Sequence, residues 1–370
     1  MTDVEELVRG VRRVAEAKIA PLARRLDEES WSDEVWDELA ALGVMGVCLP
    51  EEYGGLGLPY SAYMAVTAEV ARVSAVAALM PALNVLVARA LLRSGSDQAR
   101  AAFVPGLADG SLRGCWAFTE PATGSDPRGI RSVARPGPDG GWLLSGEKVF
   151  ISHSGHADVA VVFAQLDGRL TAFVGRTQEG FSPGRREPML AFAGADTGAV
   201  SIEGMPVREV VGEPGEGFAV LLASEAEAKL RASAICLGLA EHATEAAAAY
   251  ARTRTHRDQS IGEKFQTIQW LLAECEARTE AIRGMVERSG RLMDEGAPVG
   301  ATAAKVKLMS SRLARDVASD AMQVHGAYGY SREYDVEMLY RQAKMYELVQ
   351  GVSELNRIII ARDVLGPRRG

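Results

Sequence analysis

The stretch LYRQAKMYELVQGVSE, residues 339–354, lies near the end of a long region of helical periodicity. After the turn GEPGEG (212–217), apolar residues recur three and four positions apart almost to the end of the chain. The breaks in this pattern are rich in turn residues. They separate four predicted long helices, at about 216–253, 263–294, 299–327 and 335–364. Four long antiparallel helices predict a C-terminal bundle.

The chain before this bundle divides into two parts. Residues 1 to about 110 have helical periodicity, and Ser32, followed by an amphipathic run to Gly43, predicts a capped helix. Short alternating segments follow, and VAVVFAQLDGRLTAFVGR (159–176) is the clearest hairpin. The predicted fold class is α+β, with an N-terminal helical domain (1–112), a central β-barrel or sheet domain (113–214) and a C-terminal four-helix bundle (215–370).

Composition limits the partners. The 370 residues are 47% hydrophobic and 24% charged, with a net charge of -8 and no run of lysines and arginines. This balance is typical of an ordered globular protein and argues against nucleic acid or an anionic membrane surface as the main partner. The four cysteines lie far apart, and His153 and His156 have no third ligand candidate beside them, so we expect no metal site.

The sequence also predicts where the protein acts. The apolar stretch 78–92 is interrupted by Pro81, Asn84 and Arg89 before it reaches spanning length, so we expect no transmembrane helix. The N-terminus is charged from its first residues and has no apolar core typical of a secretory signal. We therefore expect a cytoplasmic protein.

Two segments of the β domain carry polar and aromatic groups suited to a ligand. In CWAFTEPATGSDPRG (115–129), hydroxyls and backbone N–H groups gather in a turn, although a polar loop that satisfies itself explains the same pattern. In GEKVFISHSGHADVAVV (146–162), Phe150 and Ser152 are two residues apart and should share one face of a strand. An aromatic plane beside a hydroxyl suits a flat heterocycle, and a core phenylalanine beside a surface serine is the alternative.

These two segments, together with QVHGAYGY (323–330) and the stretch 339–354, occur in an order and spacing that resembles the acyl-CoA dehydrogenase family over essentially the whole chain. The resemblance implies a flavoprotein in which FAD lies between the β domain and the bundle. It also implies a homodimer or homotetramer in which a neighbouring subunit completes the site. The usual reaction removes a proton from Cα and a hydride from Cβ of an acyl thioester.

The resemblance assigns cofactor roles by position. Residues matching the flavin-ring contacts are Trp116, Phe118, Thr119, Ser125, Phe150 and Ser152, and Ser125 is also a substrate candidate. Arg254 would meet the pyrophosphate, and Gln323 and Gly326 match the segment that contacts the adenine end from the partner subunit. Gly351, Val352, Ser353 and Glu354 match the loop beside the flavin.

The catalytic position departs from the family pattern. The family's commonest base is a glutamate directly before the glycine of that last loop, and this chain has Gln350 there, whose amide cannot take up a proton. Some members place the base on the first bundle helix instead, at the position of Ala228, next to the substrate-side arginine, which is Lys229 here. Glu225 and Glu347 are candidates for a displaced base by their helical spacing, with solvated glutamates as the alternative.

Other departures concern the cofactor. The family's Arg-x-x-Phe-Gly stretch reads Arg254-Thr-His-Arg-Asp, with one extra residue before Gln266. A threonine common beside the flavin is Val352, and the aspartate usual after Arg341 is Gln342. The β-domain matches remain, so FAD stays the expected cofactor.

The sequence therefore predicts an FAD-dependent oxidoreductase acting on an acyl thioester, bound to CoA or to a carrier protein, in a specialised pathway. An electron-transfer partner or O2 would take the electrons. Two alternatives stay open: a flavin monooxygenase on the same fold, whose oxygen chemistry needs no α-proton removal, and a redox-neutral or inactive family member.

Overall fold

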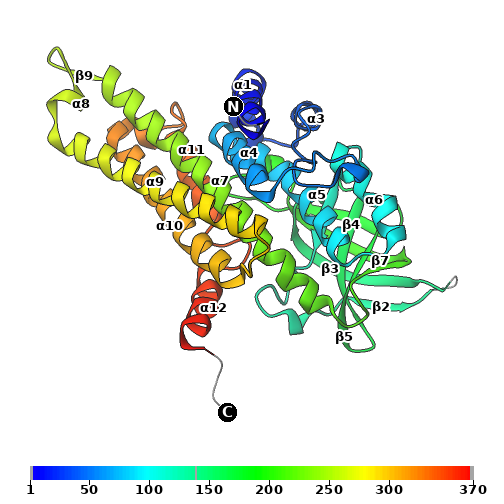
Figure 1. Cartoon of the computed structure of the whole chain (residues 1–370). Coiled ribbons are helices and arrows are strands. Elements are labelled where there is room, and N and C mark those ends of the chain that lie inside the picture. Colours follow the sequence, from blue (N-terminus) through cyan, green and yellow to red (C-terminus); the bar gives the residue numbers. More distant parts are fainter. Residues whose placement is uncertain (1–2, 138–139, 367–370) are drawn as a thin grey trace. The chain divides into compact units, whose positions relative to one another are not determined.

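A computed structural model describes residues 3–137 and 140–366 of the chain (Figure 1). Its helices are α1 (Asp3–Val14), α2 (Ala23–Glu28), α3 (Asp33–Ala41), α4 (Tyr60–Val73), α5 (Ala75–Ser94), α6 (Asp97–Asp109), α7 (Gly217–Thr253), α8 (Ile261–Lys264), α9 (Gln266–Asp294), α10 (Gly300–His325), α11 (Val336–Met345) and α12 (Ser353–Leu365). Its strands are β1 (Gly114–Ala117), β2 (Val133–Pro136), β3 (Trp142–Ile151), β4 (Val159–Leu166), β5 (Arg169–Arg176), β6 (Phe181–Arg186), β7 (Gly198–Val207), β8 (Glu209–Val211), β9 (Thr255–His256) and β10 (Gln259–Ser260). The ends of the predicted domains, at residues 1 and 370, lie outside the described residues.

Tertiary contacts group the chain into two compact units. The first contains the described residues up to 28, then 60–78 and 228–366, and the second contains 29–59 and 79–227 without residues 138 and 139. The N-terminal helices are thus divided between the units, and the predicted boundaries at 112 and 214 remain a prediction.

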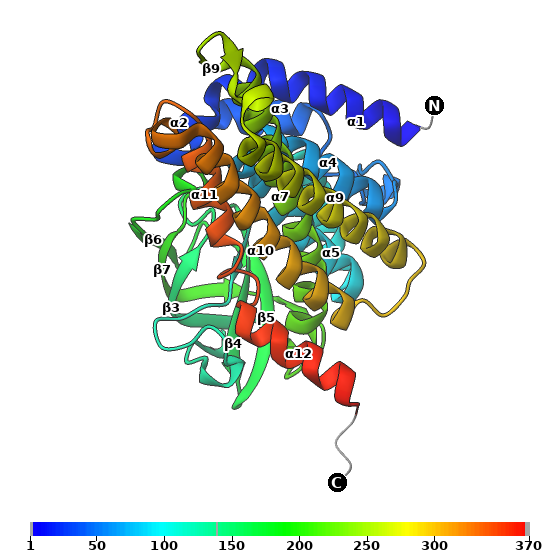
Figure 2. The ribbon, with the colours of Figure 1, turned by 90° about the vertical axis from the view of Figure 1, so that its left-hand side faces the viewer.

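The first unit is built of long helices. In both views α7, α9 and α10 run alongside one another, with α11 and α12 packed on α10 (Figures 1 and 2). Glycines let some of these helices approach closely. A Cβ on Gly238 of α7 would lie 2.4 Å from the carbonyl oxygen of Ala68 on α4. Close backbone approach of this kind requires the smallest side chain.

The predicted fourth helix of the bundle is wrong in one respect. The structure has two helices, α11 and α12, where one was expected at 335–364. The chain leaves the helix after Met345, and Gln350 and Gly351 have φ angles of 54° and 81°. Two successive left-handed residues cannot continue a right-handed helix. The break includes Gln350.

The second unit is organised around an eight-stranded sheet with the order β6-β7-β3-β2-β4-β5-β8, and β1 pairs with β4 in parallel. Strand β4 alternates its side chains between two cores. Val159, Val161 and Phe163 pack with residues of α5 and α6, whereas Ala160 and Val162 pack with the other side of the sheet. Because side chains on both faces of β4 are buried, residues 159–164 are all apolar.

Two local predictions for this unit are confirmed. Strands β4 and β5 pair antiparallel through a tight turn at Asp167 and Gly168, whose φ angles are 50° and 75°. Left-handed conformations at both turn residues are typical of a two-residue hairpin. Ser32 caps α3, and its side chain accepts a hydrogen bond from the Val35 N–H.

The apolar stretch 78–92 is not interrupted as predicted. Helix α5 continues through Pro81, and it alone among the described helices is long and apolar enough to cross a membrane. Of its most apolar window, 89% is buried inside the protein, as in a core helix.

Candidate active site

The two β-domain segments that carried the ligand prediction lie side by side. The Val149 N–H donates to the Thr119 carbonyl oxygen over 2.9 Å, and the Lys148 ammonium donates to that of Phe118 over 3.2 Å. We call residues 116–125 together with 148–152 the sheet-side motif. The rings of Trp116 and Phe118 both contact Phe163, with centroids 5.2 Å and 5.3 Å from it.

Phe150 has an unusual conformation. Its φ angle is 56°, and its side chain is 57% exposed. The left-handed conformation costs a non-glycine residue about 1–2 kcal/mol, and the exposed ring recovers none of this cost by burial. Strain of this kind persists where surrounding structure enforces it, often at functional sites.

The expectation that Phe150 and Ser152 share one face of a strand is wrong. A register shift interrupts the pairing of β3 with β7 between Lys148 and Ile151, and Ser152 lies beyond the strand end. The positive φ of Phe150 breaks the alternation on which the expectation rested. Ser152 contacts the Thr197 hydroxyl over 3.0 Å, and Ser125 is exposed on the neighbouring turn.

A buried ion pair between Lys148 and Glu120 joins the two segments of the sheet-side motif. The Lys148 ammonium, fully buried, donates to Glu120 Oε1 over 2.8 Å and to the Phe163 carbonyl oxygen over 2.6 Å. Burial lowers the pKa of Lys148 to about 8, with Glu120 opposing the shift. Burial alone would raise the pKa of Glu120, but hydrogen bonds from Lys148 and Ser132 outweigh it and hold that pKa below its usual value. Glu120 is therefore a structural group of this turn.

In the helical unit, the candidate site is the segment between α11 and α12, residues 346–352, which we call the bundle loop. The carbonyl oxygen of Gly351 accepts two hydrogen bonds of 2.9 Å each, from the Lys307 ammonium on α10 and the Asn356 amide on α12. A Cβ on Gly351 would lie 3.0 Å from Lys229 Cε. Both the left-handed φ and the approach of Lys229 therefore favour glycine.

Gln350 turns its side chain toward α7. In the orientation that satisfies both amide atoms, Nε2 donates to the Ala228 carbonyl oxygen over 2.9 Å, and Oε1 accepts from the guanidinium of Arg231. Arg231 is only 2% exposed, and Lys229 is 5% exposed. The structure thus brings together Gln350 and Ala228, the two positions that the sequence resemblance suggested for a base.

The candidates for a displaced base lie in other surroundings. Glu347 does not share a helical face with Gln350, because the bundle loop is not helical. Its carboxylate meets Lys344 over 2.5 Å and Arg315 over 3.0 Å. Glu225 is half-buried on α7, three residues before Ala228. Glu227, two residues further along α7, is buried.

Glu227 is a buried structural anion. It pairs with Arg89 over 2.8 Å and also with Arg93. Burial opposes ionisation, but the two arginines outweigh it and keep the pKa of Glu227 below its usual value.

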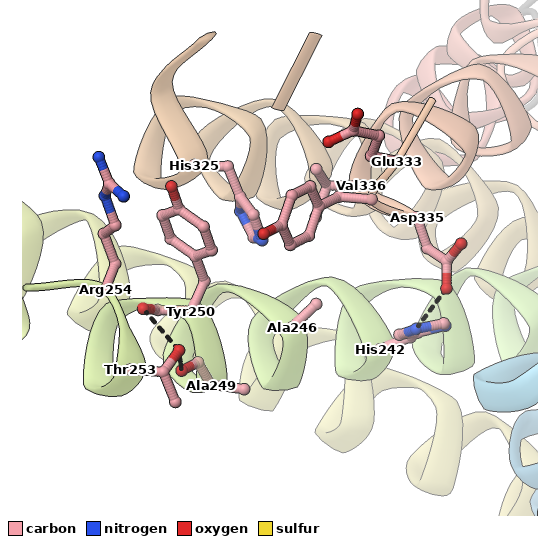
Figure 3. A pocket seen from close by; sticks show the side chains of 11 residues that line it. His242, Ala246, Ala249, Tyr250, Thr253, Arg254, His325, Glu333, Asp335 and Val336 are labelled. Carbon is pink, nitrogen blue, oxygen red and sulfur yellow. Dashed lines mark hydrogen bonds and ion pairs between the residues drawn. The ribbon is translucent and has the colours of Figure 1, made fainter. Parts of the chain in front are cut away.

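The Arg254 region lies at another part of the helical unit, beside a cavity of about 520 Å³ (Figure 3). Tyr250 stacks on His325 with ring centroids 4.2 Å apart, and Tyr334 meets both rings edge-on. Figure 3 shows Arg254 beside Tyr250 at one end of the cavity and His242 with Asp335 at the other. Aromatic faces with a cation at the rim suit a phosphorylated heterocycle.

The departures around Arg254 have a structural form. Arg257 and Asp258, at the positions where the sequence resemblance leads one to expect Phe-Gly, form the turn of the β9–β10 hairpin with left-handed φ angles of 50° and 67°. Gln323 is exposed at the end of α10, and Gly326 caps that helix with a φ of 60°. At the start of α12, Val352 is half-buried and Glu354 is exposed.

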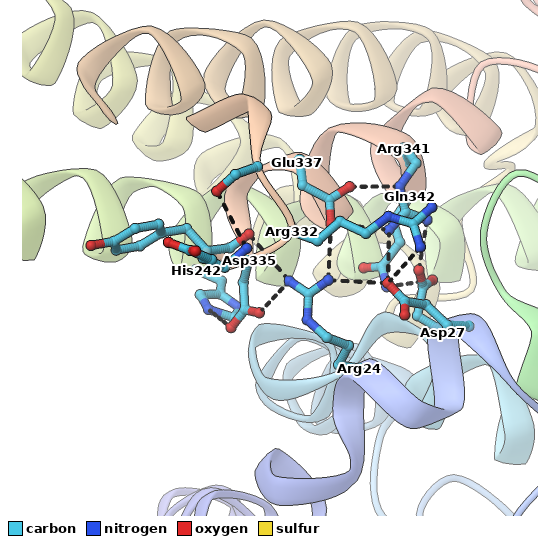
Figure 4. A network of polar contacts seen from close by, with 12 residues as sticks. Arg24, Asp27, His242, Arg332, Asp335, Glu337, Arg341 and Gln342 are labelled. Atoms are coloured by element: carbon cyan, nitrogen blue, oxygen red, sulfur yellow. Dashed lines mark hydrogen bonds and ion pairs between the residues drawn. The ribbon is translucent and has the colours of Figure 1, made fainter. Parts of the chain in front are cut away.

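Gln342, where the sequence resemblance leads one to expect an aspartate, lies beside a carboxylate from α2 (Figure 4). Asp27 of α2 accepts from Gln342 Nε2 over 2.9 Å and from Arg341 over 2.8 Å. Arg341 also pairs with Glu337, which contacts Arg24 in turn. The buried carboxylate that Arg341 needs comes from α2.

Sequence reasoning missed Arg231 and Lys148. Arg231 stands in the otherwise apolar run LRASAICLGLA (230–240), and a lone arginine there is a detectable signal for a buried polar contact. Lys148 gives no such signal, because it directly follows another charged residue, Glu147, in its strand. Only the structure shows that Glu147 is exposed and Lys148 is buried.

Comparison with known proteins assigns the family. The N-terminal, middle and C-terminal domain models of acyl-CoA dehydrogenases match residues 2–111, 115–205 and 215–365. The chain is 31% identical to an acryloyl-CoA reductase (NADH) of Anaerotignum propionicum, over 98% of this chain and 94% of the relative. It is 32% identical to an acyl-CoA dehydrogenase of Bacillus subtilis, over 96% of each chain.

A solved structure shares the fold. Butyryl-CoA dehydrogenase from Megasphaera elsdenii superposes with a TM-score of 0.95 at 29% identity, and the match covers 99% of both chains. The predicted order of helical domain, sheet domain and helical domain is thereby confirmed. The chain belongs to the acyl-CoA dehydrogenase family and is a flavin-dependent oxidoreductase with FAD as its cofactor.

Proposed function

We propose that the protein oxidises or reduces the Cα–Cβ bond of an acyl thioester whose α-proton is acidic enough to move without a carboxylate at position 350. The observation that carries the proposal is the engagement of Gln350 with Ala228 and Arg231, which leaves an amide where the family holds its base. A positioned general base contributes about 10²–10⁴ in rate. A substrate with an unactivated α-carbon would lose that factor.

Features of each unit, taken separately, fit parts of FAD. In the sheet unit, Phe150 has an exposed ring, and the preceding residue, Val149, is hydrogen-bonded to the Thr119 carbonyl oxygen. In the helical unit, Arg254 and the stacked rings of Tyr250 and His325 border the cavity. FAD when bound supplies the hydride-accepting or hydride-donating chemistry. The chain's own contribution is to orient the thioester and hold its polar atoms.

The roles of the remaining residues are part of this proposal. Trp116, Phe118 and Ser152 would hold the flavin ring. Gly351, Val352 and Glu354 would approach the ribityl-phosphate part of FAD. Gln323 and Gly326, both exposed, would contact the adenine end of FAD bound by a second copy. Exposure of Tyr330 (88%) on the same turn supports a homo-oligomeric contact there. We also propose an electron-transfer protein as redox partner, with the acyl group carried by CoA or a carrier protein.

The test begins with the purified protein. We expect near-stoichiometric FAD, identified after denaturation. The protein is then mixed anaerobically with butyryl-CoA or with a matched thioester that carries an electron-withdrawing group on Cα, and loss of the oxidised flavin absorbance is followed. The activated thioester should react about 100-fold faster or more, since it needs less help with its α-proton. Equal rates for the two thioesters would refute the proposed substrate class, and failure to bind FAD would contradict the cofactor assignment.

A further inference from the structure

Arg231 is a buried cation on α7. It is 2% exposed, and its neighbours Leu230 and Ala232 are fully buried. A guanidinium taken out of water is costly unless its donors are satisfied. One of its N–H groups donates to Gln350 Oε1, so α7 supplies a fixed cation directly to the side chain that replaces the family's base.

Both polar atoms of the Gln350 amide form hydrogen bonds with residues of α7. Nε2 donates to the Ala228 carbonyl oxygen, and Oε1 accepts from Arg231. An amide fits this pair of partners because it carries both a donor and an acceptor. A carboxylate would keep the contact to Arg231 but would place an acceptor 2.9 Å from a carbonyl oxygen, where no proton is available to share.

Other charged groups also lie around the bundle loop. Lys229 from α7 approaches Gly351, and Lys307 from α10 donates to its carbonyl oxygen. Glu347, within the loop, is already paired with Lys344 and Arg315. Tyr346 is fully buried, and its pKa is raised well above its usual value by burial. Lys229 and Lys307 thus bring positive charge to the bundle loop.

We propose that Arg231 is a positioning and specificity-determining residue. It locks the Gln350 amide against α7 and would hold any carboxylate placed at position 350 as an ion pair instead of a base. This inference rests on the proposed function for its catalytic meaning. An opposite charge at contact distance lowers the pKa of a carboxyl by about 1–3 units. A base so stabilised takes a proton from carbon poorly, so a carboxylate at position 350 would not by itself open the site to unactivated thioesters.

The proton-transfer test uses the FAD-loaded protein and three variants: Gln350→Glu, Gln350→Glu with Arg231→Met, and Arg231→Met alone as the control. Butyryl-CoA is incubated anaerobically in D2O, and uptake of deuterium at Cα is measured by mass spectrometry between pH 6 and 9. The proton passes from Cα to the carboxylate and exchanges with solvent, and a deuteron returns to Cα. No electrons leave the thioester in this exchange.

The expected order follows from the ion pair. Gln350→Glu should exchange less than about 10-fold faster than the natural protein, at a rate nearly independent of pH. The double variant should exchange about 100-fold faster than Gln350→Glu, with a rate that rises with pH as its carboxyl ionises. Arg231→Met alone, which still has no carboxylate at position 350, should remain far slower than the double variant. Equal exchange rates for Gln350→Glu and the double variant, whether both are fast or both are slow, would show that the inference is wrong.

A second measurement needs neither flavin nor thioester. The stability of Gln350→Glu is compared with that of the natural protein from pH 3 to 6 by urea unfolding. If Arg231 pairs with the new carboxylate, the folded pKa lies below the unfolded value, so the variant gains stability relative to the natural protein as pH rises. A relative loss with rising pH would show a buried, unpaired carboxylate and overturn the inference. Loss of FAD binding in the natural protein would defeat the proposed function and leave this measurement valid.

Discussion

The sheet-side motif and the bundle loop both place a buried cation beside a residue of the candidate site, but they give it different partners. In the sheet, Lys148 meets the carboxylate of Glu120, which also accepts from Ser132. In the bundle, Arg231 meets the neutral amide of Gln350. The first arrangement is a complete ion pair that supports a turn. The second sets a buried cation against a neutral side chain, so the two arrangements should respond differently to substitution.

The largest effect should come from breaking the sheet's ion pair. Replacing Lys148 by Met leaves Glu120 buried without its cation, and removal of one partner of a buried pair costs about 3–5 kcal/mol of unfolding free energy. Urea unfolding at pH 7 measures this loss. The double variant Glu120→Gln with Lys148→Met is the control, and it should recover much of the loss. A single variant that loses less than about 1 kcal/mol would show that the pair is not structural.

Acid should weaken the sheet unit through a buried histidine. His153 is fully buried, and its Nδ1 lies 3.0 Å from the Gly114 carbonyl oxygen. Burial lowers its pKa from 6.5 to about 3. Between these values the unfolded chain binds the extra proton, so stability falls as pH drops, by about 1.4 kcal/mol per unit and about 2 kcal/mol from pH 6.5 to 5.

The variant His153→Asn isolates this contribution. Asparagine tolerates the left-handed φ of 64° at this position and does not titrate. The free energy of unfolding is measured at pH 6.5 and at pH 5. Between these two values it should fall by about 2 kcal/mol more in the natural protein than in the variant. Equal losses would mean that His153 is not held neutral. Other buried histidines titrate in both proteins and cancel in the difference.

In the bundle loop, the left-handed backbone of Gly351 should make replacement by alanine destabilising. Gly351→Ala should cost about 1–2 kcal/mol because of its φ of 81°, with a further cost from the contact with Lys229. Gly284→Ala, in the middle of α9 with nothing near its Cβ, is the matched control and should stabilise by about 0.5–1 kcal/mol. Thermal unfolding of both variants measures the two signs. A neutral Gly351→Ala would show that the loop adjusts freely.

Sequence patterns predicted the fold well where period and turn chemistry act locally. The hairpin at Asp167 and Gly168 and the cap at Ser32 follow from nearest neighbours, and the structure confirms both. The single helix expected at 335–364 failed because its apolar pattern continues through the bundle loop. The break depends on contacts from Lys307 and Asn356, which lie elsewhere in the sequence.

The candidate site was predictable in its residues and less so in its geometry. The absence of a carboxylate at Gln350 can be read directly from the sequence, but the Arg231 contact requires knowing which face of α7 meets the bundle loop. The sequence placed Phe150 and Ser152 on one face, and the positive φ of Phe150 prevented it. A side-chain rule based on regular strands cannot foresee a backbone that leaves the regular conformation.

The smallest expected effect on stability tests whether the strain at Phe150 serves the cofactor. Phe150→Asn should gain up to about 1 kcal/mol in the FAD-free protein, because asparagine accepts the left-handed conformation and little burial is lost. Phe192 has nearly the same conformation, with a φ of 66°, but is 1% exposed, so Phe192→Asn should instead lose about 3 kcal/mol or more. FAD titration should show weaker binding to Phe150→Asn despite its greater stability. Unchanged affinity would mean that the exposed ring does not contact the flavin, and that the strain at Phe150 needs another explanation.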